Sequence, residues 1–161
     1  MKDENLATFA AGCFWGVEKA FRSLDGVIRT EVGYTGGSVE APTYGAVCGG
    51  ETGHAEAVQV TFNPDIVSYD ELLQIFWKVH DPSARDRVKH DVGGQYRSAI
   101  FFHSAEQRAR AIASLRAEEL SGKYERSIAT EINPATKWWR AEAYHQQYLE
   151  KIEARKPESG V

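Results

Sequence analysis

The chain has 161 residues, 42% hydrophobic and 26% charged, a composition typical of one soluble domain over residues 1–161 rather than a disordered chain. Its formal net charge of -4 argues against nucleic acid or an anionic membrane as a partner, because both bind basic surfaces. The first residues, MKDENLATF, lack an apolar signal core, and no apolar run is long enough to span a bilayer, so we expect a cytoplasmic protein. We also expect it to be a monomer.

Hydrophobic periodicity predicts alternating strands and helices along the chain. The expected strands span residues 5–11, 27–34, 54–62, 97–103 and 128–132, and the expected helices span residues 14–24, 68–79, 104–120 and 140–156. Two long loops, residues 36–53 and 80–95, separate these elements. Because two strands follow one another within this order, we expect an α+β two-layer sandwich with a mixed sheet. Its centre would be a ferredoxin-like β-α-β-β-α-β core, with a C-terminal helix added.

The first expected helix begins beside Cys13, one of two cysteines in the sequence. Neither Cys13 nor Cys48 belongs to a disulfide framework or to a zinc-binding pattern, which leaves a reactive thiol or a buried thiol. A thiol at a helix N-terminus faces unpaired N–H groups and the positive end of the helix dipole, which favour the thiolate. The other polar residues of this helix, Glu18, Lys19 and Arg22, are expected on its solvent face.

Glu56 lies near the start of an expected strand and shares one face with Val58, Val60 and Phe62. This alternation predicts an inward side chain, although the strand end also allows the carboxylate to reach solvent. An inward carboxyl group without a salt bridge has a raised pKa and stays protonated near neutrality. Such a group is suited to act as a general acid.

Tyr44 and Tyr96 lie in or beside the two long loops, where a phenol can donate to an oxygen with partial negative charge. Each tyrosine can equally be a packed aromatic residue. Asp91 lies in a loop with too few apolar residues to belong to the core.

Five blocks of sequence together resemble the A-type peptide methionine sulfoxide reductases. They are GCFWG (12–16), TYGAVCGGETGHAE (43–56), HDP (80–82), DVGGQYRS (91–98) and AEAYHQQYL (141–149). The resemblance implies thiol-dependent reduction of methionine S-sulfoxide, free or in proteins, to methionine, without a metal or organic cofactor. It also implies a role in protein repair under oxidative stress.

The resemblance further implies a role for each matching residue. Cys13 matches the nucleophile that attacks sulfur and becomes a sulfenic acid, and Glu56 matches the acid that protonates the sulfoxide oxygen. Tyr44 and Tyr96 match the phenols that hold this oxygen, and Asp91 matches a carboxylate that organises the site. The matches to the apolar wall that receives the methyl group are Phe14 and Trp15.

This sequence departs from the family pattern in the step that restores Cys13. Many members carry resolving cysteines in a C-terminal tail, whereas here no cysteine follows Cys48. We expect a buried, non-resolving thiol at Cys48 and reduction of the sulfenic acid by an external thiol, either glutathione with glutaredoxin or thioredoxin. A Cys13–Cys48 disulfide is the alternative. Smaller departures are Lys89, His90, Gly94 and Ala143.

Two other functions agree with parts of the pattern. A cysteine hydrolase or acyltransferase would pair Cys13 with His54 or His145, and would need no added reductant. A peptide-binding module would use an aromatic pocket and would keep its function without the Cys13 thiol.

Overall fold

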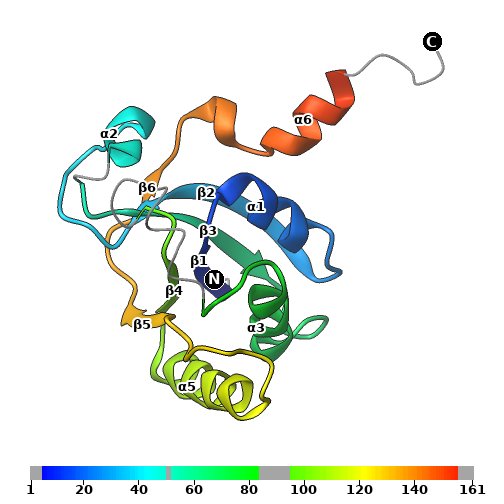
Figure 1. The fold of residues 1–161 in the computed structure, drawn as a ribbon. Coiled ribbons are helices and arrows are strands. Elements are labelled where there is room, and N and C mark those ends of the chain that lie inside the picture. The colour runs from blue at the N-terminus through cyan, green and yellow to red at the C-terminus, as the bar shows by residue number, and fades with distance from the viewer. Residues whose placement is uncertain (1–4, 50–51, 84–94, 156–161) are drawn as a thin grey trace.

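The computed structural model describes residues 5–49, 52–83 and 95–155. Its elements are β1 (Asn5–Ala11), α1 (Phe14–Arg22), β2 (Val27–Thr35), α2 (Tyr44–Cys48), β3 (Ala55–Phe62), α3 (Tyr69–Lys78), β4 (Ser98–Phe102), α5 (Ala105–Leu120), β5 (Glu131–Pro134), β6 (Trp139–Arg140), the 3-10 helix η1 (Ala143–His145) and α6 (Tyr148–Arg155). The strands of this part of the chain form a six-stranded sheet in the order β5-β4-β1-β3-β2-β6 (Figure 1).

The centre of the sheet has the order β4-β1-β3-β2, and each of its neighbouring pairs is antiparallel. This agrees with a ferredoxin-like arrangement, in which α1 and α3 connect strands that are not neighbours. At the two edges, β5 runs parallel to β4 and β6 runs antiparallel to β2, so the sheet is mixed. The predicted α+β class is confirmed.

One face of the sheet holds the main core, beneath α1 and α3. Phe9 of β1 stacks on Phe21 of α1 with ring centroids 5.1 Å apart, and it lies 5.4 Å from Phe76 of α3. The alternate residues of the strands face a second, smaller cluster that is rich in alanine. Because side chains alternate along β3, Val58 and Glu56 both face the helices.

Local sequence signals place the starts of two helices correctly. At α3, the Ser68 side chain accepts from the N–H of Glu71, and the Glu71 carboxylate accepts from the N–H of Ser68. At α5, Ser104 accepts from the N–H of Gln107. These caps satisfy N–H groups that have no partner within the helix, which is why they mark helix starts in sequence.

The single terminal helix expected over residues 140–156 is wrong. The chain instead forms β6, η1 and α6. The Gln146 side chain leaves the helix path to accept from the N–H of Val32 and donate to its carbonyl oxygen, both at 2.9 Å. Gln147 then has a φ of 50°, a left-handed conformation that no α-helix accepts.

Three further expectations need correction. The loop over residues 36–53 contains the short helix α2, whose first turn is capped by the Thr43 side chain. The strand expected at residues 128–132 is β5, which spans residues 131–134, because its parallel pairing with β4 sets its register. Glu18, expected on the solvent face of α1, is 0% exposed, because the C-terminal segment covers this side of the helix.

Close packing at the β2–β6 edge leads to a stability prediction. Gly33 pairs with Arg140, and a Cβ at this glycine would come within 2.5 Å of the backbone oxygen of Trp139. We expect Gly33→Ala to lower the free energy of unfolding by about 1–3 kcal/mol, because β6 must move away. Urea unfolding measures this value.

Gly45→Ala is the matched control, since nothing in the described residues lies within 4 Å of a Cβ there. Its free energy of unfolding should stay within about 0.5 kcal/mol of the starting value. An equal loss in both variants would contradict the packing explanation.

Candidate active site

Cys13 lies at the turn between β1 and α1 and is the residue that precedes the first turn of α1. Gly12 has a φ of 99°, in the left-handed region that glycine adopts most easily, so the chain turns sharply just before the cysteine. The Cys13 residue is exposed, and no disulfide occupies its sulfur. Its position at the start of a helix agrees with the sequence prediction.

The electrostatic balance at Cys13 differs from the expected one. The residue as a whole is exposed, but partial burial of the thiol raises its pKa above the ordinary value. The backbone N–H groups of Trp15 and Gly16 lower this pKa, and the charge of Glu56 raises it again. The net direction of the pKa shift is upward, although the helix N-terminus by itself favours the thiolate. The helix N-terminus contributes as predicted, but desolvation is the larger effect.

This raised pKa predicts slow alkylation of the substrate-free protein. Because a raised pKa leaves less thiolate at neutral pH, iodoacetamide should modify Cys13 more slowly than a free thiol. The rate should rise about tenfold per pH unit from pH 6 to pH 8, as long as the pH stays below the pKa. Mass spectrometry of a Cys48→Ser variant isolates this reaction; a rate already constant above pH 7 would contradict the raised pKa.

Glu56 brings a carboxyl group to the residue that follows the cysteine. It is 1% exposed, and the N–H of Phe14 donates to its Oε1 at 3.3 Å. The predicted inward orientation is confirmed, and the solvent-facing alternative is wrong. A buried carboxyl group therefore lies against the N-terminus of the helix that begins beside Cys13.

Two phenols share these electrostatic surroundings. Burial raises the pKa of Tyr44, with further contributions from its hydrogen bond with the Cys48 thiol and from the charges of Glu56 and Cys13. Burial also raises the pKa of Tyr96, and the charge of Glu56 is the next cause. The structure thus brings Tyr44 and Tyr96 within electrostatic range of both candidate catalytic groups.

Backbone contacts explain how three separate segments meet here. The N–H of Glu56 donates to the carbonyl oxygen of Gln95 at 2.8 Å, and the Gln95 side chain donates to the carbonyl oxygen of Cys48 at 3.2 Å. Gln95 therefore ties α2 to β3 and places the following residue, Tyr96, beside them.

Cys48 is half-buried rather than fully buried, so that expectation is wrong. The cause is its place at the end of the short helix α2, above the sheet rather than within the core. Its charge contributes to the raised pKa of Cys13, so the two thiols lie within electrostatic range of each other. Asp91 lies outside the described residues, as do Lys89, His90 and Gly94.

The two expected wall residues differ in exposure. Phe14 is 1% exposed, whereas Trp15 is half-buried. The indole N–H of Trp15 donates to Nδ1 of His145 at 2.9 Å, and the Trp15 ring stacks on Tyr148 with centroids 3.9 Å apart. Phe14 therefore supports the site from inside, and Trp15 presents the larger apolar surface.

Glu142, to which no sequence pattern assigns a role, connects three parts of the site. Its carboxylate accepts from the hydroxyl of Tyr34 at 2.8 Å and from the N–H of Tyr44 at 2.9 Å. Partial burial raises the pKa of Glu142, but these hydrogen bonds and its own backbone N–H lower it overall. The clue was present in AEAYHQQYL, where polar and aromatic residues lack the apolar period of a helix.

Neither histidine proposed for a hydrolase is available as a base for Cys13. His145 is 0% exposed, burial lowers its pKa, and its Nδ1 accepts from Trp15. His54 uses Nδ1 to accept from the N–H of Gly37 at 3.0 Å, and its Nε2 lies 2.7 Å from the carbonyl oxygen of Val39. These contacts remove the support for the hydrolase hypothesis.

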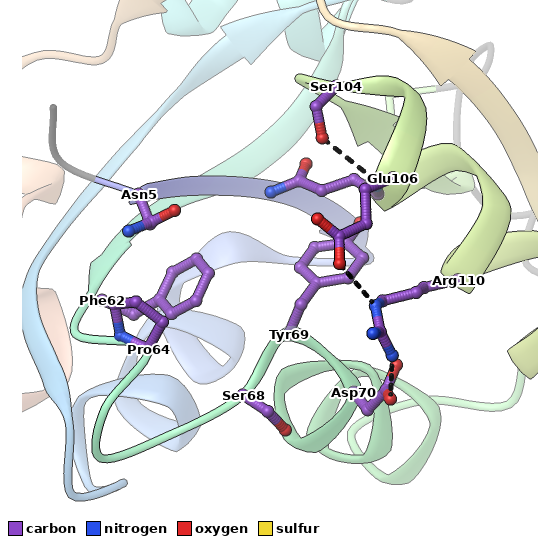
Figure 2. Close-up of a pocket in the computed structure, with 10 residues that line it drawn as sticks. Asn5, Phe62, Pro64, Ser68, Tyr69, Asp70, Ser104, Glu106 and Arg110 are labelled. Carbon is purple, nitrogen blue, oxygen red and sulfur yellow. Dashed lines mark hydrogen bonds and ion pairs between the residues drawn. The ribbon is translucent and has the colours of Figure 1, made fainter.

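Other features lie away from these residues. A pocket of about 260 Å³ lies at the far end of the sheet, where Asn5 pairs with Phe62. Figure 2 shows it beside Tyr69, with Arg110 bridging α5 and α3 through ion pairs to Glu106 and Asp70 at 3.2 and 2.7 Å. In the described ranges no group of three or more histidine, cysteine, aspartate or glutamate residues is placed to hold a metal ion. None of the helices there is both long and apolar enough to cross a membrane.

These features are typical of an enzyme that works through a thiol: an accessible cysteine at a helix start, a buried carboxyl group and two phenols in an α+β fold. The family model described as peptide methionine sulfoxide reductase matches residues 5–159. The chain therefore belongs to the peptide methionine sulfoxide reductase family, and it is an oxidoreductase of the A type.

Individual relatives agree with this assignment. Peptide methionine sulfoxide reductase MsrA of Methanothermobacter thermautotrophicus is 59% identical over 150 residues, covering 93% of this chain and 89% of that protein. MsrA of Geobacter metallireducens is 56% identical and covers 90% of each chain.

Solved structures give the same picture of the fold. Reduced Mxr1 from Saccharomyces cerevisiae has a TM-score of 0.84 and 36% identity, covering 96% of this chain and 88% of that one. Mxr1 in complex with Trx2 has a TM-score of 0.62 and 28% identity, covering 90% and 84% of the two chains.

Proposed function

We propose that this enzyme reduces the S epimer of methionine sulfoxide, free or in proteins, through a sulfenic acid on Cys13. The observation that carries the proposal is the contact between Glu56 and the N–H of Phe14, which holds a buried carboxyl group beside the cysteine. Residues 1–161 would form one catalytic domain, which repairs oxidised methionine in proteins.

The proposed step needs a thiolate and an acid together. The Cys13 thiolate attacks the sulfoxide sulfur and forms an S–S bond, while Glu56 gives its proton to the sulfoxide oxygen. The resulting hydroxyl group is then transferred to the Cys13 sulfur as the S–S and S–O bonds break, and the freed electron pair stays on the methionine sulfur. Methionine leaves in reduced form, while Cys13 is oxidised to the sulfenic acid. Without protonation the oxygen is a poor leaving group, so the acid lowers the barrier.

The raised pKa of Cys13 is compatible with this step. A negative charge on Glu56 disfavours the thiolate, and the two groups therefore favour a single negative charge between them. The reactive form has that charge on sulfur and the proton on Glu56. The backbone N–H groups of Trp15 and Gly16 stabilise the charge on sulfur in this form.

The remaining site residues would bind the substrate. Tyr44 and Tyr96 keep their protons, because burial raises both pKa values, and each can donate to the sulfoxide oxygen. Trp15, backed by Phe14, would contact the methyl group. Asp91 would help organise this site, as the family resemblance implies.

A direct assay tests the reductase function. Purified protein is incubated with methionine S-sulfoxide and dithiothreitol, and the release of methionine is followed by chromatography. We expect turnover with the S epimer and little with the R epimer. The absence of turnover with either epimer would refute the proposal.

We propose that an external thiol restores Cys13. The cysteine is exposed, so an incoming thiol can reach its sulfur, whereas the Cys48 thiol is engaged by the hydroxyl of Tyr44. Glutathione with glutaredoxin is one candidate donor. Thioredoxin is the other, and the complex of the related Mxr1 with Trx2 supports it.

The recycling proposal predicts a specific change in mass. After one turnover without reductant, the intact protein should gain the mass of one oxygen atom, because the Cys48 thiol is engaged by the hydroxyl of Tyr44 and does not attack the sulfenic acid. Dithiothreitol should then restore the original mass. A loss of two hydrogen atoms would instead mean a Cys13–Cys48 disulfide and would overturn the prediction.

A further inference from the structure

Glu18 is a carboxylate on α1 that is completely buried, at 0% exposed. Its Oε2 accepts from the hydroxyl of Thr30 at 2.7 Å and from the side-chain amide of Gln147 at 3.1 Å. Its Oε1 accepts from the backbone N–H of Gln147 at 2.8 Å. A carboxylate is costly to bury unless its oxygens are paired in this way, so the side chain is held in one position.

Two of these three hydrogen bonds come from Gln147, whose backbone is left-handed with a φ of 50°. A residue other than glycine adopts this conformation at a cost, and it persists where neighbouring contacts hold it. Glu18 supplies those contacts by binding both the backbone and the side chain of Gln147. The left-handed residue separates η1 from α6 and turns the chain between His145 and Tyr148.

His145 and Tyr148, on the two sides of this turn, both contact the indole of Trp15. Tyr148 stacks on it with ring planes 15° apart, and His145 accepts its N–H at 2.9 Å. Trp15 lies three residues before Glu18 on α1, so both face the same neighbouring segment. Figure 1 shows α6 passing beside α1.

We infer that Glu18 is a positioning residue that fixes the apolar wall of the active site. By holding Gln147, it places His145 and Tyr148 on the indole of Trp15 and so limits the space for the alkyl group on the sulfoxide sulfur. This inference rests on the proposed function. Through this wall, Glu18 would make the site favour a methyl group over larger alkyl groups on the sulfoxide sulfur.

Other contacts between α1 and α6 do not fix this turn. Lys19 forms an ion pair with Glu153, and Arg22 pairs with Glu150 at 3.3 Å, and all four side chains are at least about a third exposed. Ion pairs at a surface contribute about 0–1 kcal/mol, and Gln147 is a member of neither pair. The buried carboxylate is therefore the contact from α1 that holds Gln147, beside Gln146, which is bound to Val32 of β2.

The test compares two substrates in Glu18→Gln, methionine sulfoxide and its S-ethyl analogue. The glutamine keeps the shape of the glutamate side chain, but one of its two acceptor oxygens is replaced by an NH2 donor. This donor cannot accept a hydrogen bond from the N–H groups of Gln147. We expect the ratio of kcat/KM for methyl over ethyl substrate to fall about three- to tenfold, which is part of the roughly 10- to 200-fold discrimination that one methylene group gives in an apolar pocket. The assay uses dithiothreitol as reductant.

Two variants serve as matched controls. Glu118→Gln changes another buried carboxylate, on α5, which accepts from Lys123 at 3.2 Å and from Tyr124 at 2.8 Å. Glu153→Gln removes a surface ion pair between α1 and α6. Both should keep the methyl-to-ethyl ratio of the original enzyme. An unchanged ratio in folded Glu18→Gln, or an equal fall for both substrates, would overturn the inference.

A second measurement does not depend on turnover. The indole N–H resonance of Trp15, assigned through Trp15→Phe, should shift in Glu18→Gln as its hydrogen bond to His145 changes, and an unshifted resonance would contradict the inference. If Glu18→Gln does not fold, Tyr148→Leu takes its place in the substrate test. Its methyl-to-ethyl ratio of kcat/KM should also fall about three- to tenfold, and an unchanged ratio would overturn the inference. If the wild-type enzyme is inactive on methionine sulfoxide, the proposed function is refuted. The Trp15 resonance then still tests whether Glu18 positions the indole.

Discussion

Cys13→Ser should lower kcat for methionine S-sulfoxide by about 10⁴-fold or more, because a hydroxyl at this position cannot attack sulfur or accept its oxygen. The helix N-terminus that helps to stabilise a thiolate is not sufficient to ionise an alcohol. The measurement is methionine release with dithiothreitol in excess, together with the intact mass of the protein after sulfoxide treatment. The variant should gain no oxygen atom.

Cys48→Ser is the control for this substitution. A serine there can still bond to the hydroxyl of Tyr44, and an excess of dithiothreitol supplies the thiol for recycling. This variant should keep most of the turnover and should still gain one oxygen atom without reductant. Equal loss of activity in both variants would show that the nucleophile has been assigned wrongly.

Glu56→Gln should slow formation of the sulfenic acid by about 10²- to 10⁴-fold, the usual contribution of a general acid. The amide keeps the size of the side chain, and its oxygen can still accept from the N–H of Phe14, but it cannot give a proton to the sulfoxide oxygen. Rapid quenching of a single turnover, followed by mass spectrometry, measures this step without interference from recycling.

The pH dependence separates loss of the acid from loss of structure. When the protein no longer supplies the proton, solvent must supply it. The ratio of the rates of sulfenic acid formation in the wild-type enzyme and in Glu56→Gln should therefore decrease as the pH falls. A ratio of these two rates that stays constant with pH would indicate a structural effect of the substitution. A variant with the original rate at neutral pH would exclude Glu56 as the acid.

Much of this molecule follows from local patterns in the sequence. The alternation of β3 predicts that Glu56 faces inward, since a strand places successive side chains on opposite faces. The change from strand to helix periodicity predicts that Cys13 stands at a helix start. Capping residues such as Ser68 and Ser104 predict where two helices begin, because each forms hydrogen bonds within one turn of its own helix.

The sequence was less informative where long-range contacts decide the outcome. Glu18 has the polarity of a solvent-facing helix residue, yet a segment about 130 positions away buries it through Gln147. The single helix expected near the C-terminus fails for the same reason, because Gln146 pairs with Val32 of β2.

The sequence by itself determined the class of fold, the family resemblance and the two residues, Cys13 and Glu56, on which the proposed chemistry depends. Only the tertiary structure decided the direction of the Cys13 pKa, because desolvation depends on every group packed around the thiol. It also decided that His145 and Tyr148 hold Trp15, since this contact forms only when the end of the chain returns to the first helix.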